Sequence, residues 1–257
     1  RGNVYADITS SDPAFLNGRI DIHNVLVADA KETYALDSIK IAAISTAESD
    51  TITLKSQFID ASLSGKFQID QVPTALTNSI AKYYDTNPKG KKQATKPQQF
   101  DLKVGIKDDP ILLKLVPELT SISPIQITGR YNSEGDSITV NGKIPKIIYG
   151  ANTITNGELD IETADSALVY SLVIDDIKNS QINLPYTSLS GEVKNNKINY
   201  TLLVRDKKDE DHYLIAGNLM SAEGYTQISL EPDGLVLNYE PWDIERDNII
   251  RFGDKGI

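Results

Sequence analysis

Apolar and polar residues alternate with a period of two along most of this chain. The alternation is clearest between Ile125 and Ile174, on both sides of a turn at 132–136. Its first apolar-phase positions are Ile125, Ile127, Gly129, Tyr131, Ile138, Val140, Gly142 and Ile144. A period of two predicts β-strands with one apolar and one polar face. The question for function is therefore what the apolar face contacts.

Similar runs, separated by turn residues about every 8–12 positions, predict an antiparallel meander of roughly 16–20 strands. We expect β-strands over residues 1–72 and continuous antiparallel β-structure over 99–257. The apolar phase changes from even positions at Ile52 and Leu54 to odd positions at Ala61 and Leu63, which predicts a turn or bulge near 58–60. Ordinary twisted sheets seldom reach this number of strands without curling. Two arrangements stay open: stacked sandwiches, or one long sheet curled into a groove.

The apolar content and the strand glycines favour the groove. Apolar residues make up 40% of the 257 residues, below the roughly 45–50% of an average globular chain, which suits a thin, one-sided core. Five glycines fall in phase with the apolar residue two positions before them: Gly65, Gly129, Gly142, Gly191 and Gly217. A glycine inside a strand often marks a bend or a close backbone approach. We therefore expect a mainly β protein whose antiparallel sheet curls around its apolar face; five unrelated strand glycines are the alternative.

Residues 73–98 are predicted to be an insert made of a helix and a loop. Pro73 suits the first position of a helix over 73–85, and Leu76, Ile80, Tyr83 and Tyr84 recur on one side of it. We interpret these four side chains as a candidate lid or plug of the apolar face, with simple packing at one end of the β-core as the alternative. The loop that follows is rich in lysine, namely Lys89, Lys91, Lys92 and Lys96. A mobile, solvated linker is the favoured interpretation of this loop.

A second short helix is predicted over 110–119, because Pro110 starts a segment with apolar residues on one side. No apolar run approaches the ~20 residues that a membrane-spanning helix needs. The chain starts without methionine and is interpreted as an internal fragment of a longer protein.

The residues that usually carry chemistry are sparse. The net charge of −10 argues against a nucleic-acid partner. Cysteine is absent, and the two histidines, His23 and His212, lie far apart in the sequence. The charged segment 206–212 lacks the glycine-punctuated ligand spacing of a calcium loop. We expect no catalytic residue, no metal site and no cofactor, and predict a protein that is not an enzyme.

Three segments resemble a known family. The segment Trp242–Gly253 (WDIERDNIIRFG), together with the segments 52–67 and 73–84, is similar to the TamB family of translocation and assembly module subunits in its Bacteroidetes-type form, which is related to the AsmA-like bridge proteins. The resemblance implies an inner-membrane-anchored protein with a long periplasmic body, the β-taco, whose concave face is apolar. It also implies phospholipid transport, a role in outer-membrane biogenesis, and an Omp85-type barrel partner contacted through regions outside this chain.

A groove lined by branched aliphatic side chains can hold acyl chains, because each buried CH₂ group gains ~0.8 kcal/mol. The candidate lining residues are Leu63, Phe67, Ile127, Val140, Leu172, Ile174, Leu202, Val204 and Leu237. One alternative is a structural or chaperone-like module that assists β-barrel assembly through exposed strand edges. Another alternative, a closed β-sandwich that binds carbohydrate, is disfavoured by the single tryptophan.

Overall fold

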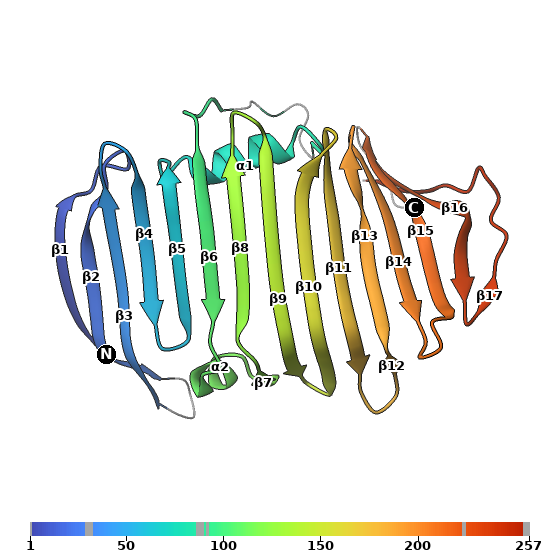
Figure 1. The fold of residues 1–257 in the computed structure, drawn as a ribbon, viewed down its shortest axis with the longest axis horizontal. Helices are drawn as coiled ribbons and strands as arrows, with labels where there is room; N and C mark the ends of the chain where they lie inside the picture. The colour runs from blue at the N-terminus through green and yellow to red at the C-terminus, as the bar shows by residue number, and fades with distance from the viewer. Residues whose placement is uncertain (1, 29–32, 86–89, 91–92, 223–224, 254–257) are drawn as a thin grey trace. The chain divides into compact units, whose positions relative to one another are not determined.

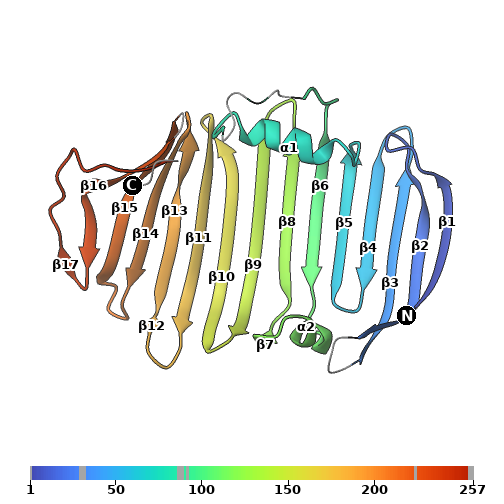
Figure 2. The same cartoon turned by 180° about the vertical axis from the view of Figure 1, so that it is seen from behind.

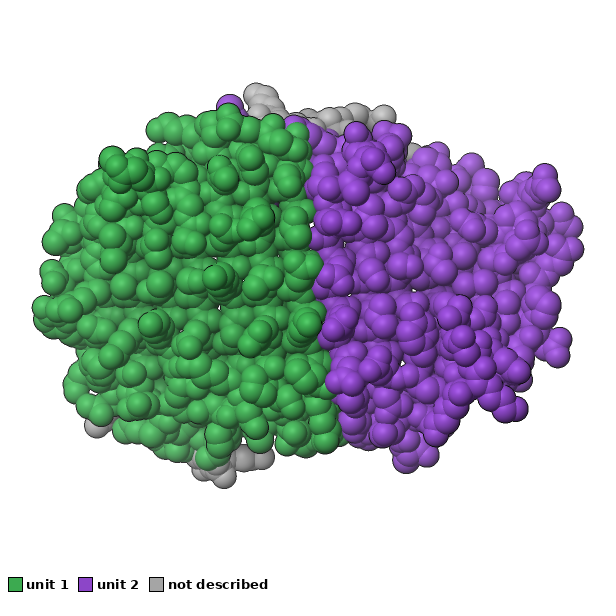
Figure 3. All heavy atoms as spheres, viewed as in Figure 1, with its two compact units in different colours: residues 1–75, 95–150 green, residues 76–94, 151–257 purple. Residues whose placement is uncertain are grey.

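The structure, a computed structural model, describes residues 2–28, 33–85, 90, 93–222 and 225–253. The chain divides into two compact units, shown in Figure 3: unit 1 comprises Arg1–Ala75 and Thr95–Gly150, and unit 2 comprises Leu76–Ala94 and Ala151–Ile257. The protein is mainly β, its described strand pairs are antiparallel, and its described residues include two helices. The predicted mainly β, antiparallel fold with short helices is therefore confirmed.

Unit 1 is an antiparallel meander, drawn from blue to yellow-green in Figure 1. Its strands are β1 (Asn3–Ser10), β2 (Asn17–Ala28), β3 (Thr33–Ser45), β4 (Asp50–Ser56), β5 (Ile59–Lys66), β6 (Gln99–Ile106), β7 (Leu119–Ile122), β8 (Ile125–Asn132) and β9 (Ser137–Tyr149). Strands β1 to β6 pair in chain order, and β6 then pairs with β8. Strands β7 and β8 both pair with β9, with Pro124 between them; one register holds from Ser121 onward, and it shifts between Leu119 and Ser121.

Unit 2 is a second antiparallel meander. Its strands are β10 (Asn152–Ala164), β11 (Ala167–Lys178), β12 (Asn183–Leu184), β13 (Tyr186–Lys194), β14 (Lys197–Arg205), β15 (Asp211–Ala222), β16 (Tyr225–Leu237), β17 (Glu240–Pro241) and β18 (Ile250–Gly253). Strands β12 and β13 share one side of β11, and both β17 and β18 pair with β16. Between β17 and β18, the side-chain amide of Asn248 bonds the backbone of Leu230 on β16 as a neighbouring strand would. It accepts a bond from the Leu230 N–H (2.7 Å) and donates to the Leu230 carbonyl (3.0 Å).

The predicted change of phase near 58–60 is confirmed, and a tight hairpin turn causes it. The Ser56 hydroxyl donates to the Ile59 carbonyl (3.1 Å) and accepts a bond from the Ile59 N–H (3.0 Å). This turn pairs Leu54 with Ala61, so even positions on β4 share a face with odd positions on β5.

Helix α1 (Val72–Ile80) forms where a helix was predicted but ends earlier than the expected residue 85. After Ile80 the backbone tightens into a turn, with the Tyr83 N–H bonded to the Ile80 carbonyl (2.9 Å). Asn196, in the turn between β13 and β14, then forms hydrogen bonds with the backbone groups of Tyr83 and Asp85. Its N–H donates to the Tyr83 carbonyl (2.9 Å), and its side-chain oxygen accepts a bond from the Asp85 N–H (2.6 Å). A contact more than a hundred residues away along the chain therefore competes with continuation of the helix.

Helix α2 (Pro110–Leu115) is also shorter than the predicted range of 110–119. Asp109 caps its start by accepting a bond from the Ile111 N–H (2.9 Å). Val116 is extended (φ −120°, ψ 95°), because a residue before proline, here Pro117, disfavours the helical conformation. Leu119 consequently begins strand β7.

Of the lysine-rich loop, Lys89, Lys91 and Lys92 lie outside the described residues. Lys96 is exposed, and its N–H donates to the side-chain oxygen of Gln71 (2.9 Å).

Candidate functional site

The strand register of unit 1 collects apolar side chains on one face, which we call the unit 1 apolar face. One row of paired residues comprises Ile8, Gly18, Ala43, Ile52, Leu63, Leu102, Gly129 and Val140. The next row on the same face comprises Ala6, Ile20, Ile41, Leu54, Ala61, Val104, Ile127 and Gly142. Because side chains alternate along a strand, the residues between these rows form the opposite, unit 1 polar face. One polar row comprises Asp7, Arg19, Ala42, Thr53, Ser62, Lys103, Thr128 and Asn141.

One end of the unit 1 apolar face is closed by aromatic rings. Phe67, directly after β5, meets Phe100 edge-on at 6.0 Å between centroids, and Phe100 meets Tyr131 at 5.2 Å. Tyr131 is 1% exposed. The outward-facing neighbours Asp101 and Arg130 are exposed and paired with each other (2.9 Å). Only the apolar side of this end is therefore covered, by the segment that leads from Phe67 into the start of α1.

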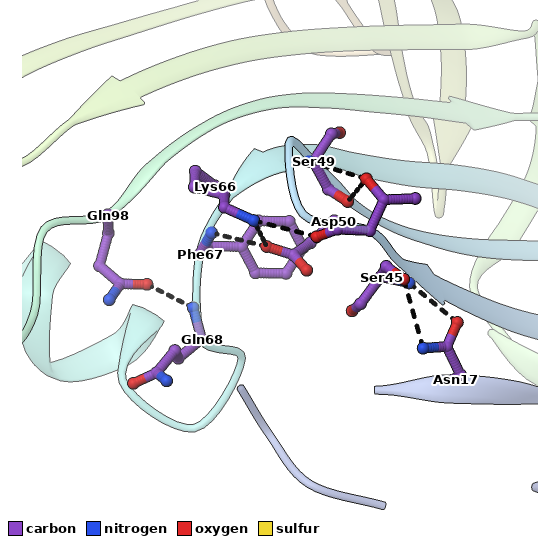
Figure 4. A network of polar contacts seen from close by, with 9 residues as sticks. Asn17, Ser45, Ser49, Asp50, Lys66, Phe67, Gln68 and Gln98 are labelled. Carbon is purple, nitrogen blue, oxygen red and sulfur yellow. Dashed lines mark hydrogen bonds and ion pairs between the residues drawn. The ribbon is translucent and has the colours of Figure 1, made fainter. Parts of the chain in front are cut away.

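A polar network fixes that covering segment (Figure 4). The Asp50 carboxylate, whose residue is 7% exposed, accepts a bond from the Phe67 N–H (3.4 Å) and lies 3.8 Å from the Lys66 ammonium nitrogen. The Gln68 N–H donates to the buried side-chain oxygen of Gln98 (2.7 Å). These contacts join the start of β4, the end of β5 and the approach to β6.

The opposite end of the unit 1 apolar face is closed by the region around α2. Leu119, Ile122 and Ile125 are buried together. The partly buried residues packed against them are Ile106, Leu112, Leu113, Ile127, Ile144 and Ile147. Figure 2 shows α2 at the far end of the unit 1 strands from the start of α1.

Between the two closed ends, the apolar face of unit 1 stays partly open. The central residues Leu63, Leu102 and Val140 are half-buried, whereas Phe100 and Ile125, on the same face but nearer its ends, are buried. The row from Ile8 to Val140 crosses eight strands, so its seven spacings of about 4.8 Å give a length of about 34 Å. The result is an apolar strip that runs across the strands and is bounded at their ends.

Unit 2 has an apolar face of its own, formed in the same way. One row comprises Leu159, Leu172, Leu189, Leu202, Ile215 and Leu235. The next row comprises Gly157, Ile174, Thr187, Val204, Tyr213 and Leu237. Most of these residues are half-buried, as in the centre of unit 1.

Tyrosine and glycine alternate across four strands of the unit 2 apolar face. Tyr170 pairs with Gly191, Gly191 with Tyr200, and Tyr200 with Gly217. A Cβ atom added at Gly191 lies 2.8 Å from the Tyr170 hydroxyl oxygen, and one added at Gly217 lies 2.8 Å from that of Tyr200. The Tyr170 hydroxyl donates to the Asn199 carbonyl across β13 (2.9 Å). Each tyrosine therefore lies over the glycine of the next strand.

Eight of the nine predicted lining residues lie on these two faces. Leu63, Ile127 and Val140 are in unit 1; Leu172, Ile174, Leu202, Val204 and Leu237 are in unit 2. The ninth, Phe67, belongs to the aromatic cluster at the end of unit 1 and is 6% exposed; Val204 is 5% exposed. Phe67 and Val204 are therefore almost inaccessible to a ligand. The other seven side chains are half-buried, and Leu63 and Val140 among them lie in the central row of the unit 1 strip.

The four candidate lid residues do not share one environment. Tyr83 is buried at 6% exposure, Leu76 and Tyr84 are half-buried, and Ile80 is 44% exposed. Tyr170 and Tyr200 were missed by sequence reasoning. Their sequence positions could have predicted them, because each lies two residues before a predicted lining residue, Leu172 or Leu202, and so on the same face of its strand.

In the part of the chain that the structure describes, no helix is long and apolar enough to cross a membrane. Within the same residues, no three or more histidine, aspartate or glutamate side chains gather in a way that would hold a metal ion. Comparison with family models, with curated proteins and with solved structures gives no match to this chain.

Proposed function

We propose that this protein binds the acyl chains of phospholipids on its apolar faces and carries them as a periplasmic segment of a TamB-type envelope protein. The observation that carries the proposal is the half-buried centre of the unit 1 apolar face, bounded at both strand ends and about 34 Å long by strand spacing. Large contiguous apolar surface in contact with water marks a binding site in most soluble proteins.

The size and chemistry of the strip suit an acyl chain. One leaflet of a bilayer has a hydrocarbon thickness of about 15 Å, so the strip is longer than one acyl chain. Its central side chains are alanine, valine, leucine and isoleucine, with glycine between them. Such a surface stabilises CH₂ groups by ~0.8 kcal/mol each and offers no side-chain hydrogen bond that fixes a ligand in one position. A chain bound there is free to slide.

The cellular setting of the proposal rests on the sequence pattern of Trp242–Gly253 and of 52–67. In this proposal the chain lies in the periplasm as part of an inner-membrane-anchored protein. An Omp85-type outer-membrane barrel is the expected partner, through regions outside this chain. The protein acts there as a binding module and not as an enzyme.

Site-specific photocrosslinking in cells tests the proposal. Crosslinkers at Leu63 and Ile127 are expected to form adducts with phospholipid, which mass spectrometry detects. Ser64 and Thr128 are matched controls, because each is the chain neighbour of a probe position on the opposite face. Equal labelling of both faces, or no lipid adduct at any position, contradicts the proposal.

A second test uses charge. Ile127→Arg is expected to lower the amount of phospholipid that copurifies with the protein, because a guanidinium in the strip must be desolvated by the acyl chains. Thr128→Arg places the same charge on the polar face and is the control. Circular dichroism of both variants checks that the β-structure is retained.

A chaperone-like role is the second candidate, and strand β1 favours it. β1 is eight residues long and lies at the rim of unit 1 in Figure 1, with Val4 67% and Ile8 54% exposed. Long, regular rim strands recruit further strands. A protein that purifies without lipid and binds unfolded β-barrel segments would support this role over lipid transport.

A further inference from the structure

The polar face of unit 1 contains a depression of about 210 Å³ between β4, β5 and β6. Six polar-face residues line it: Thr53, Lys55, Asp60, Ser62, Lys103 and Gly105. The strand register explains their proximity, since Thr53, Ser62 and Lys103 form one cross-strand row and Lys55, Asp60 and Gly105 the next. The depression thus lies on the opposite side of the sheet from the apolar strip.

Gly105 is one of the lining residues of this depression. A Cβ atom added at Gly105 meets no heavy atom within 4 Å, so the space above this residue is open. Elsewhere in the same sheet the contrast is clear, because a Cβ at Gly65 would collide with the β6 backbone at Gln99 and Phe100. Gly105 is therefore not required by backbone packing, and its lack of a side chain instead leaves room for a ligand.

The charge around the depression is positive, in a chain whose net charge is −10. Lys55 and Lys103 line it, and Lys40 on β3 pairs directly with Lys55. Among the described residues, none of these three lysines has an ion-pair partner within 4.0 Å. The Asp60 carboxylate in the lining is already paired with Lys107 (2.8 Å).

Carboxylates do not cancel this charge. Asp21 on β2 is the cross-strand partner of Lys40 on its other side, and Asp60 is the second acidic group nearby. Asp7 and Asp101, on the same face, are paired with Arg19 (3.9 Å) and Arg130 (2.9 Å). Of the lysines near the depression, Lys107 is paired with Asp60, and Lys40, Lys55 and Lys103 leave an excess of positive charge. Like charges directly opposite each other on neighbouring strands, as at Lys40 and Lys55, are destabilising, and a bound anion removes that repulsion.

We infer that this depression binds a phosphate group. A phosphate monoester carries about two negative charges and three acceptor oxygens. The side chains around the depression carry two ammonium groups, on Lys55 and Lys103, and two hydroxyls, on Thr53 and Ser62. Carbon atoms make up most of its present lining, so binding requires the ammonium groups to turn toward the phosphate. Ammonium groups bind phosphate as point charges. A carboxylate, with one charge, leaves more of the lysine charge uncompensated. The phosphate comes either from a soluble phosphomonoester or from a lipid headgroup, and the two sources give different experimental results.

Two probes separate the sources in experiments on the whole chain. The first is glycerol 3-phosphate, titrated by calorimetry and by NMR of the lysine ammonium groups. The second is phosphatidylcholine vesicles with and without phosphatidic acid, in a flotation assay. Both are measured for the wild-type protein and for three variants: Lys103→Gln, Gly105→Val and Lys146→Gln.

Lys103→Gln is expected to weaken phosphate binding about tenfold to a hundredfold, the effect of losing one charge-assisted hydrogen bond. Gly105→Val fills the depression and leaves every charge in place, so it is expected to abolish binding. Because valine is favoured in strands and meets open space here, this variant is expected to fold, with a melting temperature no lower than that of the wild type. Lys146→Gln removes an exposed lysine from β9, outside the depression, and is expected to bind as the wild type does.

Each outcome decides the inference. Binding of glycerol 3-phosphate that Lys103→Gln and Gly105→Val reduce supports a site for soluble phosphomonoesters. Binding to vesicles alone, with the same dependence on Lys103 and Gly105, supports a site for lipid headgroups. Vesicle binding that Lys146→Gln weakens as much as Lys103→Gln means general electrostatic attraction and overturns the inference, as does the absence of binding in both assays.

Discussion

Tyr170 and Tyr200 show how single residues shape the unit 2 apolar face. Each ring lies over a glycine of the next strand, Gly191 or Gly217. Glycine alone weakens a strand because it buries no side chain, and a neighbouring aromatic ring that covers it restores the lost contact. Each tyrosine–glycine pair thus presents an aromatic ring on the apolar face at a position where the glycine alone would present bare backbone.

The first prediction compares two glycines. Gly191→Ala is expected to lower the free energy of unfolding by about 1–3 kcal/mol, because the new methyl group overlaps the Asn199 carbonyl and the Tyr170 hydroxyl. Gly105→Ala meets open space, so it is expected to raise that free energy by about 0.5–1 kcal/mol. Urea unfolding of both variants measures the difference. Equal effects of the two substitutions would show that the space above each glycine is unimportant.

The second prediction concerns alkaline pH. Burial raises the pKa of the Tyr170 phenol, with Tyr200 contributing to it electrostatically, and burial likewise raises the pKa of Tyr200. Above pH ~10, where an unfolded tyrosine releases its proton, the folded protein still holds these protons. Stability is therefore present below that pH and is lost as the pH rises through the folded-state pKa values.

Urea unfolding at several pH values above and below 10 tests this dependence. Tyr170→Phe is expected to reduce the loss of stability with rising pH, because phenylalanine has no proton to release. Tyr5→Phe, at a tyrosine that is 53% exposed, is the control. An unchanged pH dependence in Tyr170→Phe would contradict the assignment to this residue.

At the scale of elements, the two helices act as closures of the sheet more than as independent structures. α2 has six residues, too few for a stable isolated helix. Its stability comes from the cap at Asp109 and from packing against the buried Leu119, Ile122 and Ile125. Helix α2, which closes one end of the apolar strip, is therefore stabilised by packing against apolar residues at that end of the strip.

The third prediction tests this closure. Leu119→Ala is expected to cost about 2–5 kcal/mol of unfolding free energy, because Leu119 is 8% exposed and belongs to the buried cluster. Leu115→Ala, at the end of α2 and 43% exposed, is expected to change it by less than about 0.5 kcal/mol. Thermal unfolding and amide hydrogen exchange in β7 measure both. Similar losses in the two variants would mean that α2 is held by its own helical propensity.

Element type was predictable from the sequence where the determinant is local. The alternation of Leu54, Ala61 and Leu63 gives strands and a turn, because the phase of a strand depends only on neighbouring residues. The end of α1 was not predictable in this way. Ile80 is followed by residues that fit a helix, but Asn196, which the fold of unit 2 brings near, bonds to Tyr83 and Asp85.

In the candidate site too, placements that depend on local sequence were predictable, and those that depend on contacts between distant segments were not. Strand parity predicts that Ile127 and Val140 share a face, and the register confirms their placement. Parity says nothing about Phe67, which leaves β5 and packs on Phe100. Nor does it indicate that Tyr170 covers Gly191, since that depends on which strands become neighbours. The depression at Gly105 could not be predicted for the same reason, because its lining residues come from three different strands.

At the scale of the whole molecule, both units are meanders in which most strands pair with the strand that comes next in the chain. This order has a consequence for how the protein is made. Contacts between close neighbours in sequence form without closing long loops, so they lower the entropic barrier to folding. Each hairpin can add to the one before it as the chain emerges from the ribosome or from a translocation channel. A nascent unit 1 can thus acquire its first strands in order from β1 while later strands are still being synthesised.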